Sequence, residues 1–481
     1  MQNGDDLPQA YREARAADEP FWQTQEKRIQ GATGQPCCSL SGISSGLIAM
    51  DGNFAVIIHG EDECAACFLH YGPSSWRFFC TGLTERHFVT GETAAPLRAC
   101  LERVCEEVQP DAVFVLGACP VEVIGDRFET VVADVGRQFP DIPMKAMHTS
   151  GLKVGSQAAM ADWMYATLVD LPMLPPVDRG WRERVQARGM ALVDAAVHAD
   201  PAEILRLAQQ AQDERSPPAL VREDCVAFLG LPSPDDLGGY RAEWEDVLPE
   251  VGLTITGRYP YGASLDDWRA ATFPAVVFVV DRSLYPKTVK ALERGGTSVV
   301  NVPLPVGTRA TETFYRVIGE ATGRTEQLQT TLQTRRNAAQ EALRAASDRF
   351  AGLRMAMGLR MLNNYRADQL AQQGLGDFDA LDEMGFRLTV MVQGPPEKKD
   401  KFARIFELHG VDVPFEVFPE PWNLSEHLGG DRFDIAYLAD HCRGEARKAG
   451  VPMIVSRLLY PGYEGVAKNC AAIGATLDRL L

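Results

Sequence analysis

Short apolar runs recur along the chain, separated by longer stretches whose apolar residues have helical spacing. Two of the runs, FAVII at 54–58 and AVFVL at 112–116, are continuous enough to predict strands that are buried on both faces. Between them, APLRACLERVCEEV at 95–108 predicts a helix, so the order strand, helix, strand indicates a right-handed parallel crossover. A further strand near 143–146 and a helix over 157–168 extend this unit.

The same pattern returns twice more along the chain. A polar, alanine-rich stretch at 325–350 predicts one long helix, and a final helix is expected over 466–481. We therefore predict an α/β fold built from three open parallel-sheet domains. The strands expected in the second and third domains are CVAFLGL, LTITGRY, AVVFVVD and SVVNVPLPVG, followed by LRMAMGL, FRLTVMVQG, FDIAYLAD and VPMIVSRLLYPGYEG.

Composition shifts and chain length suggest where the domains begin and end. At about 150 residues per domain, 481 residues correspond to two to four domains, and the strand pattern favours three. Residues 1–30 are expected to form an N-terminal arm, and 31–215 the first α/β domain with a helical connector rich in Ala, Arg and Asp. Residues 216–324 form the second α/β domain, and 325–481 the long helix and the third domain.

Charge and hydrophobicity restrict the class of protein. The formal net charge of −17 argues against nucleic acid and anionic membranes as partners, because both require basic surfaces. The chain shows no apolar run of the roughly 18 to 20 residues that span a bilayer, and its first residues lack the order of a signal peptide. A cytoplasmic location is expected. In that reducing compartment the 11 cysteines are not expected to form disulfides, and five of them should be small buried residues, namely Cys100, Cys105, Cys225, Cys442 and Cys470.

Three other cysteines lie in segments that are expected to be loops at strand ends or the starts of helices. They are Cys38 in QPCCSLSGISSG, Cys64 in HGEDECAACF and Cys119 in LGACPVEVIGD. Loops at one edge of a parallel sheet share a crevice, so three thiolates there are a candidate iron–sulfur site. On the residues alone, the alternative is that all three are small buried residues. Cys67 and Cys80 are interpreted as core residues.

Several ionisable residues accompany these cysteines. Glu122 and Asp126 are candidates for proton transfer, but capping of a helix that starts near Gly125 is the favoured role. His59 is expected to satisfy backbone groups at a strand end, and His148 to pack or face solvent. The sequence contains no GxxxxGK[ST] phosphate loop, so any nucleotide hydrolysis is expected on another protein.

With these motifs in place, the chain resembles the nitrogenase component 1 family, whose subunits consist of three Rossmann-like α/β domains. The resemblance is to the β-type subunit and runs from about residue 30 to the end of the chain. HGEDEC is similar to that subunit's His-Gly-Ser-Gln-Gly-Cys segment, and ACPVEVIGD to its Cys-x-x-Glu-Val-Ile-Gly-Asp segment. HTSGLKVGSQ, NVPLPVG and GYEGVAKN also resemble segments of that subunit.

The resemblance implies that Cys38, Cys64 and Cys119 bind half of an iron–sulfur cluster shared with a homologous α-type subunit. The cluster would be of the P-cluster type, 8Fe-7S or a related 4Fe-4S form. Cys37 is an alternative to Cys38. Ser150, or with less support Ser156, corresponds to the family's serine that contacts the oxidised cluster. The resemblance assigns no catalytic residue to this chain, which would relay electrons within an α2β2 heterotetramer.

Departures from the family pattern refine this interpretation. The α-type subunit binds a catalytic iron–sulfur cofactor through a cysteine and a histidine, but this chain has Cys225 within a strand and Ser456 before RLLYPGYEG. The cofactor is therefore expected on the partner subunit. Electrons are expected to arrive from an ATP-dependent iron–sulfur reductase, which is a homodimer. The segments AACFLHYGPSSW and VTGE favour a nitrogenase-like reductase, with methylthio-alkane reductase and C–S cleavage as our choice. The alternatives are a cofactor assembly scaffold, a β subunit of a nitrogenase or tetrapyrrole reductase, and a nucleotide- or sugar-binding protein.

Overall fold

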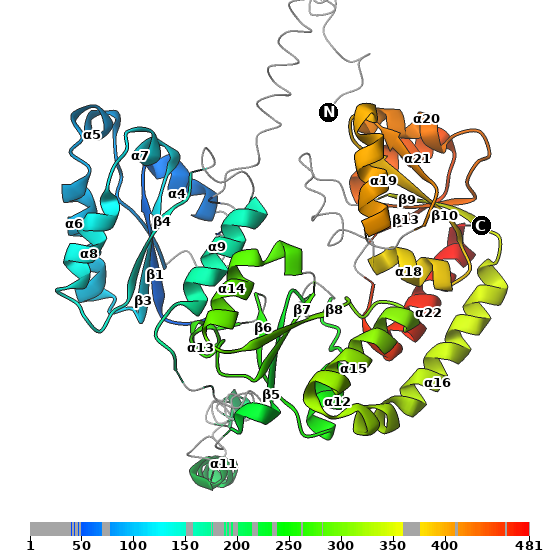
Figure 1. Cartoon of the computed structure of the whole chain (residues 1–481), viewed down its shortest axis with the longest axis horizontal. Helices are drawn as coiled ribbons and strands as arrows, with labels where there is room; N and C mark the ends of the chain where they lie inside the picture. Colours follow the sequence, from blue (N-terminus) through cyan, green and yellow to red (C-terminus); the bar gives the residue numbers. More distant parts are fainter. Residues whose placement is uncertain are drawn as a thin grey trace, which may run out of the picture.

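Three parallel β-sheets with covering helices make up the chain in a computed structural model (Figure 1). This confirms the predicted fold class. The structure describes residues 50–69, 77–150, 157–174, 201–213, 220–232, 238–260, 263–280, 282–358, 376–408, 412–456 and 459–480, and single positions at 40, 43, 47, 176, 187–188, 190–191 and 194–195. The predicted N-terminal arm lies outside these residues.

The first sheet has the strand order β2-β1-β3-β4, and every neighbouring pair is parallel. Its strands are β1 (Phe54–His59), β2 (Phe78–Cys80), β3 (Ala112–Gly117) and β4 (Met144–His148). Three of them match the predicted strands, while the short edge strand β2 gave no signal of its own. The helices are α4 (Asp62–Leu69), α5 (Glu85–Thr90), α6 (Ala94–Glu107), α7 (Cys119–Val123), α8 (Phe128–Gly136) and α9 (Gln157–Val169).

The second sheet, in the order β6-β5-β7-β8, follows helix α11 (Pro201–Asp213). Helix α11 lies apart from the three sheets at the bottom of Figure 1. The strands are β5 (Cys225–Leu229), β6 (Thr254–Tyr259), β7 (Val276–Val280) and β8 (Ser298–Val302). The helices are α12 (Trp244–Glu250), α13 (Leu265–Arg269), α14 (Pro286–Arg294) and α15 (Thr308–Thr322).

The third sheet has five strands in the order β11-β10-β9-β12-β13. They are β9 (Arg354–Gly358), β10 (Arg387–Gln393), β11 (Phe415–Phe418), β12 (Ile435–Leu438) and β13 (Met453–Val455). The helices are α16 (Thr325–Phe350), α18 (Gly376–Glu383), α19 (Lys399–Leu408), α20 (Leu424–Leu428), α21 (Arg443–Ala449) and α22 (Gly462–Leu480). The long helix α16 has the predicted bounds, whereas α22 begins at Gly462 rather than at 466.

Strand residues alternate between two hydrophobic clusters, which explains why the strands read as continuous apolar runs. In β5, Val226 and Phe228 belong to a cluster shared with the third sheet, and Ala227 and Leu229 to a cluster shared with the first sheet. The second sheet is therefore covered on both faces and joins the other two into one body. Burial on both faces removes the polar alternation that a half-exposed strand would show.

Buried carboxylates from one domain cap helices of another. Asp162 on α9 accepts the Lys287 and Thr288 N–H groups at the start of α14, both at 2.9 Å. Glu383 on α18 accepts the Thr308 and Arg309 N–H groups at the start of α15, at 2.6 and 2.9 Å. These helices begin after Tyr285 and Gly307, neither of which supplies a side-chain cap, so the free N–H groups are satisfied from another domain.

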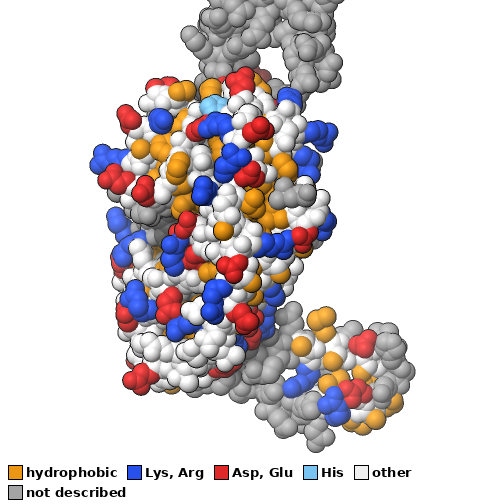
Figure 2. Space-filling view, turned by 90° about the vertical axis from the view of Figure 1, so that its right-hand side faces the viewer, with side chains coloured by type: hydrophobic (Ala, Val, Ile, Leu, Met, Phe, Trp, Pro, Cys, Tyr) orange, Lys and Arg blue, Asp and Glu red, His pale blue; other side chains and the backbone are white. Residues whose placement is uncertain are grey.

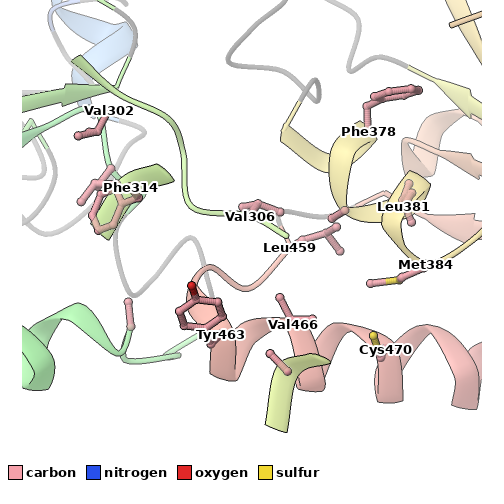
Figure 3. Close-up of a cluster of buried hydrophobic side chains, with 14 of the residues drawn as sticks. Val302, Val306, Phe314, Phe378, Leu381, Met384, Leu459, Tyr463, Val466 and Cys470 are labelled. Atoms are coloured by element: carbon pink, nitrogen blue, oxygen red, sulfur yellow. The ribbon is translucent and has the colours of Figure 1, made fainter. Parts of the chain in front are cut away.

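The third such contact joins the second and third sheets. Glu243, which is 2 % exposed, accepts the Tyr463 and Glu464 N–H groups of α22 at 2.9 and 3.0 Å and the Tyr315 O–H at 3.1 Å. Gly462 fits this contact because its φ is +83° and a Cβ there would lie 2.7 Å from the Glu243 Cδ atom. Figure 3 shows Tyr463 beside the apolar side chains that α15, α18 and α22 place between the two sheets.

The surface carries charges of both signs. Figure 2 shows lysine and arginine side chains lying among aspartate and glutamate side chains on one side of the molecule. Ion pairs such as Arg354–Asp434, at 2.8 Å, join partly exposed side chains of opposite charge. Within the described ranges, none of the helices is both long and apolar enough to cross a membrane.

Candidate functional site

Cys64 and Cys119 lie on neighbouring segments at the carboxyl edge of the first sheet. Cys64 is on α4, directly after β1, and Cys119 is the first residue of α7, directly after β3. The strands β1 and β3 are adjacent and parallel, and the Ala118 N–H donates to the His59 carbonyl oxygen at 3.0 Å. A Cβ at Gly60 would lie 2.5 Å from the Ala118 Cβ and 3.9 Å from the Cys64 Cβ, so glycine allows the two segments to touch.

Ser150 lies at the same edge, on the segment that follows β4. Its neighbour Thr149 binds the Gly117 carbonyl oxygen twice, through its N–H at 3.2 Å and its hydroxyl at 2.7 Å. Ser150 itself is fully buried. The exits of β1, β3 and β4 thus bring Cys64, Cys119 and Ser150 to one edge.

The remaining predicted ligand, Cys38, lies outside the described residues, as do its alternative Cys37 and Ser156. Two residues after Cys38, Leu40 is buried in the hydrophobic cluster that also contains Ala118 and is contacted by Cys64.

Thiols and a hydroxyl at this edge are suitable iron–sulfur ligands by chemical type, since soft sulfur matches iron. Cys64 and Cys119 are both half-buried, which leaves each thiol partly accessible. Among the described residues, no group of three His, Cys, Asp or Glu side chains has an arrangement that could hold a metal ion.

His59 is held from both sides of its ring. The ring is fully buried, with Nε2 at 3.1 Å from Asp126 Oδ2 and Nδ1 at 3.2 Å from the Thr81 hydroxyl. Burial lowers the pKa of His59, although the hydrogen bond and the negative charge of Asp126 oppose that effect. A neutral ring donates from Nε2 to Asp126 and accepts the Thr81 O–H at Nδ1.

A second histidine at the same edge has a similar contact. His148, the last residue of β4, contacts Glu122 through Nδ1, and the Glu122 side chain is 2 % exposed. The Phe128 ring lies beside both histidines, with centroid distances of 5.6 Å to His59 and 4.8 Å to His148. Gly117 leaves room for that ring, because a Cβ there would lie 2.6 Å from it.

The expectation that Glu122 and Asp126 cap a helix is wrong. Helix α8 begins at Phe128 without a side-chain cap, and the two carboxylates contact His148 and His59 instead. The interpretation of His59 as a partner for backbone groups is also wrong. The sequence did contain a signal for these contacts. His59 and His148 are the last residues of β1 and β4, and the segment after β3, the strand between them, carries both Glu122 and Asp126.

Cys80 is a further residue of this edge that the sequence did not indicate. The predicted core role is wrong, because Cys80 is half-buried at the end of β2. Its thiol lies 3.6 and 3.5 Å from the carbonyl oxygens of Gly60 and Glu61, at the turn before Cys64. Burial raises the pKa of the Cys80 thiol. The prediction of burial is also wrong for Cys100, which is half-buried, and is confirmed for Cys105, Cys225, Cys442 and Cys470.

Exposed apolar side chains surround this edge. Val89 on α5 is 81 % exposed, and Val123 and Ile124 at the end of α7 are 70 % and 40 % exposed. Both helices lie at the carboxyl end of the first sheet, as Figure 1 shows.

Three parallel sheets and a cysteine-bearing edge define an α/β protein with a candidate iron–sulfur site. The family model described as nitrogenase component 1 type oxidoreductase matches residues 45–473, and the chain belongs to that family.

Relatives of known name and structure agree with this assignment. The chain is 27 % identical over 156 residues to the nitrogenase iron-molybdenum cofactor biosynthesis protein NifE of Sinorhizobium fredii, a match that covers 28 % of this chain and 32 % of that protein. It is 28 % identical, with the same coverage, to the protein of that name from Mesorhizobium japonicum. The match thus spans about a third of these relatives' length.

The solved structures resemble the chain over nearly its whole length. "Nitrogenase Cp1 at pH 6.5" has a TM-score of 0.63 and 14 % sequence identity, with 93 % of each chain covered. The structure of Cp1 at pH 5 has a TM-score of 0.59 and 14 % identity, with 91 % of this chain and 87 % of that chain covered. At this identity the likeness shows the fold.

Proposed function

We propose that this chain is the β-type subunit of a nitrogenase-like reductase, in which Cys38, Cys64 and Cys119 bind one half of a P-cluster-type iron–sulfur centre. The observation that carries the proposal is the meeting of Cys64 and Cys119 at the exits of two adjacent strands, with Ser150 at the exit of the next. A homologous α-type subunit supplies the other ligands. Ser150 would contact the cluster in one of its redox states, and its burial at the exit of β4 supports that role.

The centre relays single electrons when it is bound, and the residues of this chain hold it and limit its contact with water. The buried hydroxyl of Ser150 and the apolar cluster next to Cys64 support a site of low dielectric. The catalytic iron–sulfur cofactor belongs to the partner subunit, because the position before the C-terminal glycine turn holds Ser456, a short side chain buried after β13.

Electrons arrive from an ATP-dependent iron–sulfur reductase, a homodimer that docks transiently. Val123 and Ile124 belong to the surface for that protein, since they are exposed and apolar and follow Cys119 in the same segment. The complex is an α2β2 heterotetramer of the cytoplasm. Its substrate class is small methylthio-alkanes, which are cleaved reductively at a C–S bond.

Metal analysis of the anaerobically purified heterotetramer tests this function. Wild-type protein should contain about eight irons per αβ pair at the interface beyond those of the partner's cofactor. Cys64→Ala and Cys119→Ala should lose the interface iron and the turnover of methylthio-alkanes. Cys100→Ala is the matched control, because Cys100 is a half-buried cysteine of α6 in the same domain. Retention of interface iron in both ligand variants would contradict the proposal.

A second candidate function is a scaffold for iron–sulfur cofactor assembly, which the similarity to NifE favours. A scaffold releases its iron to an acceptor protein, whereas a reductase keeps it through repeated turnover. Incubation of iron-57-labelled complex with a metal-free acceptor, followed by separation, distinguishes the two. Retention of the label with substrate reduction supports the reductase, and transfer of the label without reduction supports the scaffold.

A further inference from the structure

We propose that His59–Asp126 and His148–Glu122 are positioning pairs that set the relative placement of the Cys64, Cys119 and Ser150 segments. The inference rests on the proposed function, which assigns cluster binding to those three segments. It concerns residues that do not bind the cluster themselves. Both carboxylates come from the segment that contains Cys119, and each histidine ends a strand next to β3.

The first pair connects both ends of the Cys119 segment to one residue of β1. The backbone carbonyl of His59 accepts the Ala118 N–H at 3.0 Å, and the His59 ring binds Asp126 at 3.1 Å. One residue of β1 therefore holds both ends of the segment 118–126, which contains Cys119. Within the segment, the Asp126 N–H donates to the Val121 carbonyl oxygen at 3.1 Å and closes the turn after α7.

The same histidine also reaches the Cys64 segment. Its Nδ1 accepts the Thr81 hydroxyl, and the oxygen of that hydroxyl accepts the Gly60 N–H at 3.1 Å. The Gly60 carbonyl oxygen accepts the Leu83 N–H at 2.8 Å. Movement of the His59 ring would thus disturb the turn that leads to Cys64 and the segment that contains Cys119 together.

The second pair connects the middle of the Cys119 segment to the exit of β4. Glu122 lies on α7 and contacts His148, which is two residues before Ser150. A backbone contact runs beside it, from the Thr149 N–H to the Gly117 carbonyl oxygen at 3.2 Å. The Phe128 ring fills the space between the two histidines, so each pair limits the movement of the other.

Hydrogen exchange of the metal-free, full-length chain tests the proposal without iron. Asp126→Ala should speed exchange of the Ala118 and Leu83 amides, and Glu122→Ala that of the Thr149 amide, each by about tenfold or more, because one charged hydrogen bond is lost. The Val113 amide, which donates to the Pro143 carbonyl oxygen at the opposite edge, should stay unchanged.

Conservative and control variants separate positioning from general stability. Asp126→Asn and Glu122→Gln keep an oxygen acceptor at the same place and should exchange within about threefold of wild type. Glu129→Ala is the matched control, since Glu129 is 47 % exposed and lies 3.6 Å from the other nitrogen of His148. This variant should leave the exchange rates of all four amides unchanged, namely those of Leu83, Val113, Ala118 and Thr149. If Asp126→Ala does not fold, the Glu122 variants and Asp126→Asn still decide the outcome.

The loaded complex provides a second readout. Asp126→Ala and Glu122→Ala should keep bound iron but shift the reduction potential and the electron paramagnetic resonance signal of the interface centre, and the conservative variants should restore both. The proposal would be overturned if the alanine variants left the amide exchange rates unchanged. It would also be overturned if exchange at Val113 accelerated as much as exchange at Ala118. A wild-type complex without interface iron would instead refute the proposed function. The exchange experiment on the metal-free chain would still test the positioning pairs in that case.

Discussion

Replacement of Glu243 by alanine should weaken the contact between the second and third domains. The carboxylate accepts hydrogen bonds from Tyr463 N–H, Glu464 N–H and Tyr315 O–H at 2.9, 3.0 and 3.1 Å. A hydrogen bond to a charged group stabilises a protein by about 1.5–3 kcal/mol, so three would total about 5–9 kcal/mol. Burial raises the pKa of Glu243, because desolvation disfavours the charged carboxylate, and the same desolvation opposes this gain.

The net loss in Glu243→Ala should therefore be smaller than the sum of the bonds. We expect a loss of about 2–4 kcal/mol. The desolvation cost that disappears with the carboxylate lowers this value, and the two helix N–H groups that lose their cap keep it well above zero. Glu243→Gln should lose about half as much, because an amide keeps a single acceptor oxygen. The loss should be local to the start of α22 before it becomes global, because this contact joins two domains.

Native-state hydrogen exchange of the Tyr463 and Glu464 amides measures the local change, and urea unfolding measures the global change. Asp246→Ala is the control on the same helix, since Asp246 is 54 % exposed and pairs with Arg241 at the surface. Its effect should stay below about 0.5 kcal/mol. A loss in Glu243→Ala as small as in this control would refute the reasoning.

Three further substitutions test other parts of the fold. Burial lowers the pKa of His59, so the unfolded chain takes up the proton first as the pH falls. Stability should therefore fall below about pH 6.5, by at most about 1.4 kcal/mol per pH unit, and His59→Gln should lack this component in urea titrations at several pH values. Gly117→Ala should cost about 1–3 kcal/mol in the same assay, because the new Cβ would lie 2.6 Å from the Phe128 ring; no cost would contradict that packing. Asp162→Ala should cost about 1–2 kcal/mol and speed exchange of the Lys287 and Thr288 amides, and unchanged exchange would exclude the cap.

Local sequence pattern determined the elements of this protein. The runs at β1 and β3 predicted strands buried on both faces, the runs at β5 and β7 predicted strands, and the alanine-rich stretch predicted α16 with its observed bounds. Because residues in a strand or helix repeat at fixed periods, the period of burial is recorded in the sequence itself. The edge strands β2 and β11 were not predicted from the sequence.

The cysteine motifs also indicated loops after strands, and the structure has Cys64 and Cys119 at the exits of β1 and β3. What the sequence did not decide is which polar side chains meet there. His59 and Asp126 are 67 positions apart in the chain, and Thr288 and Asp162 are 126 apart. Such pairs depend on the order of the strands in each sheet and on how the sheets pack together. Those contacts join segments that are distant in sequence, so no local period records them, and only the tertiary structure revealed that the acids of the Cys119 segment hold the histidines that end the adjacent strands.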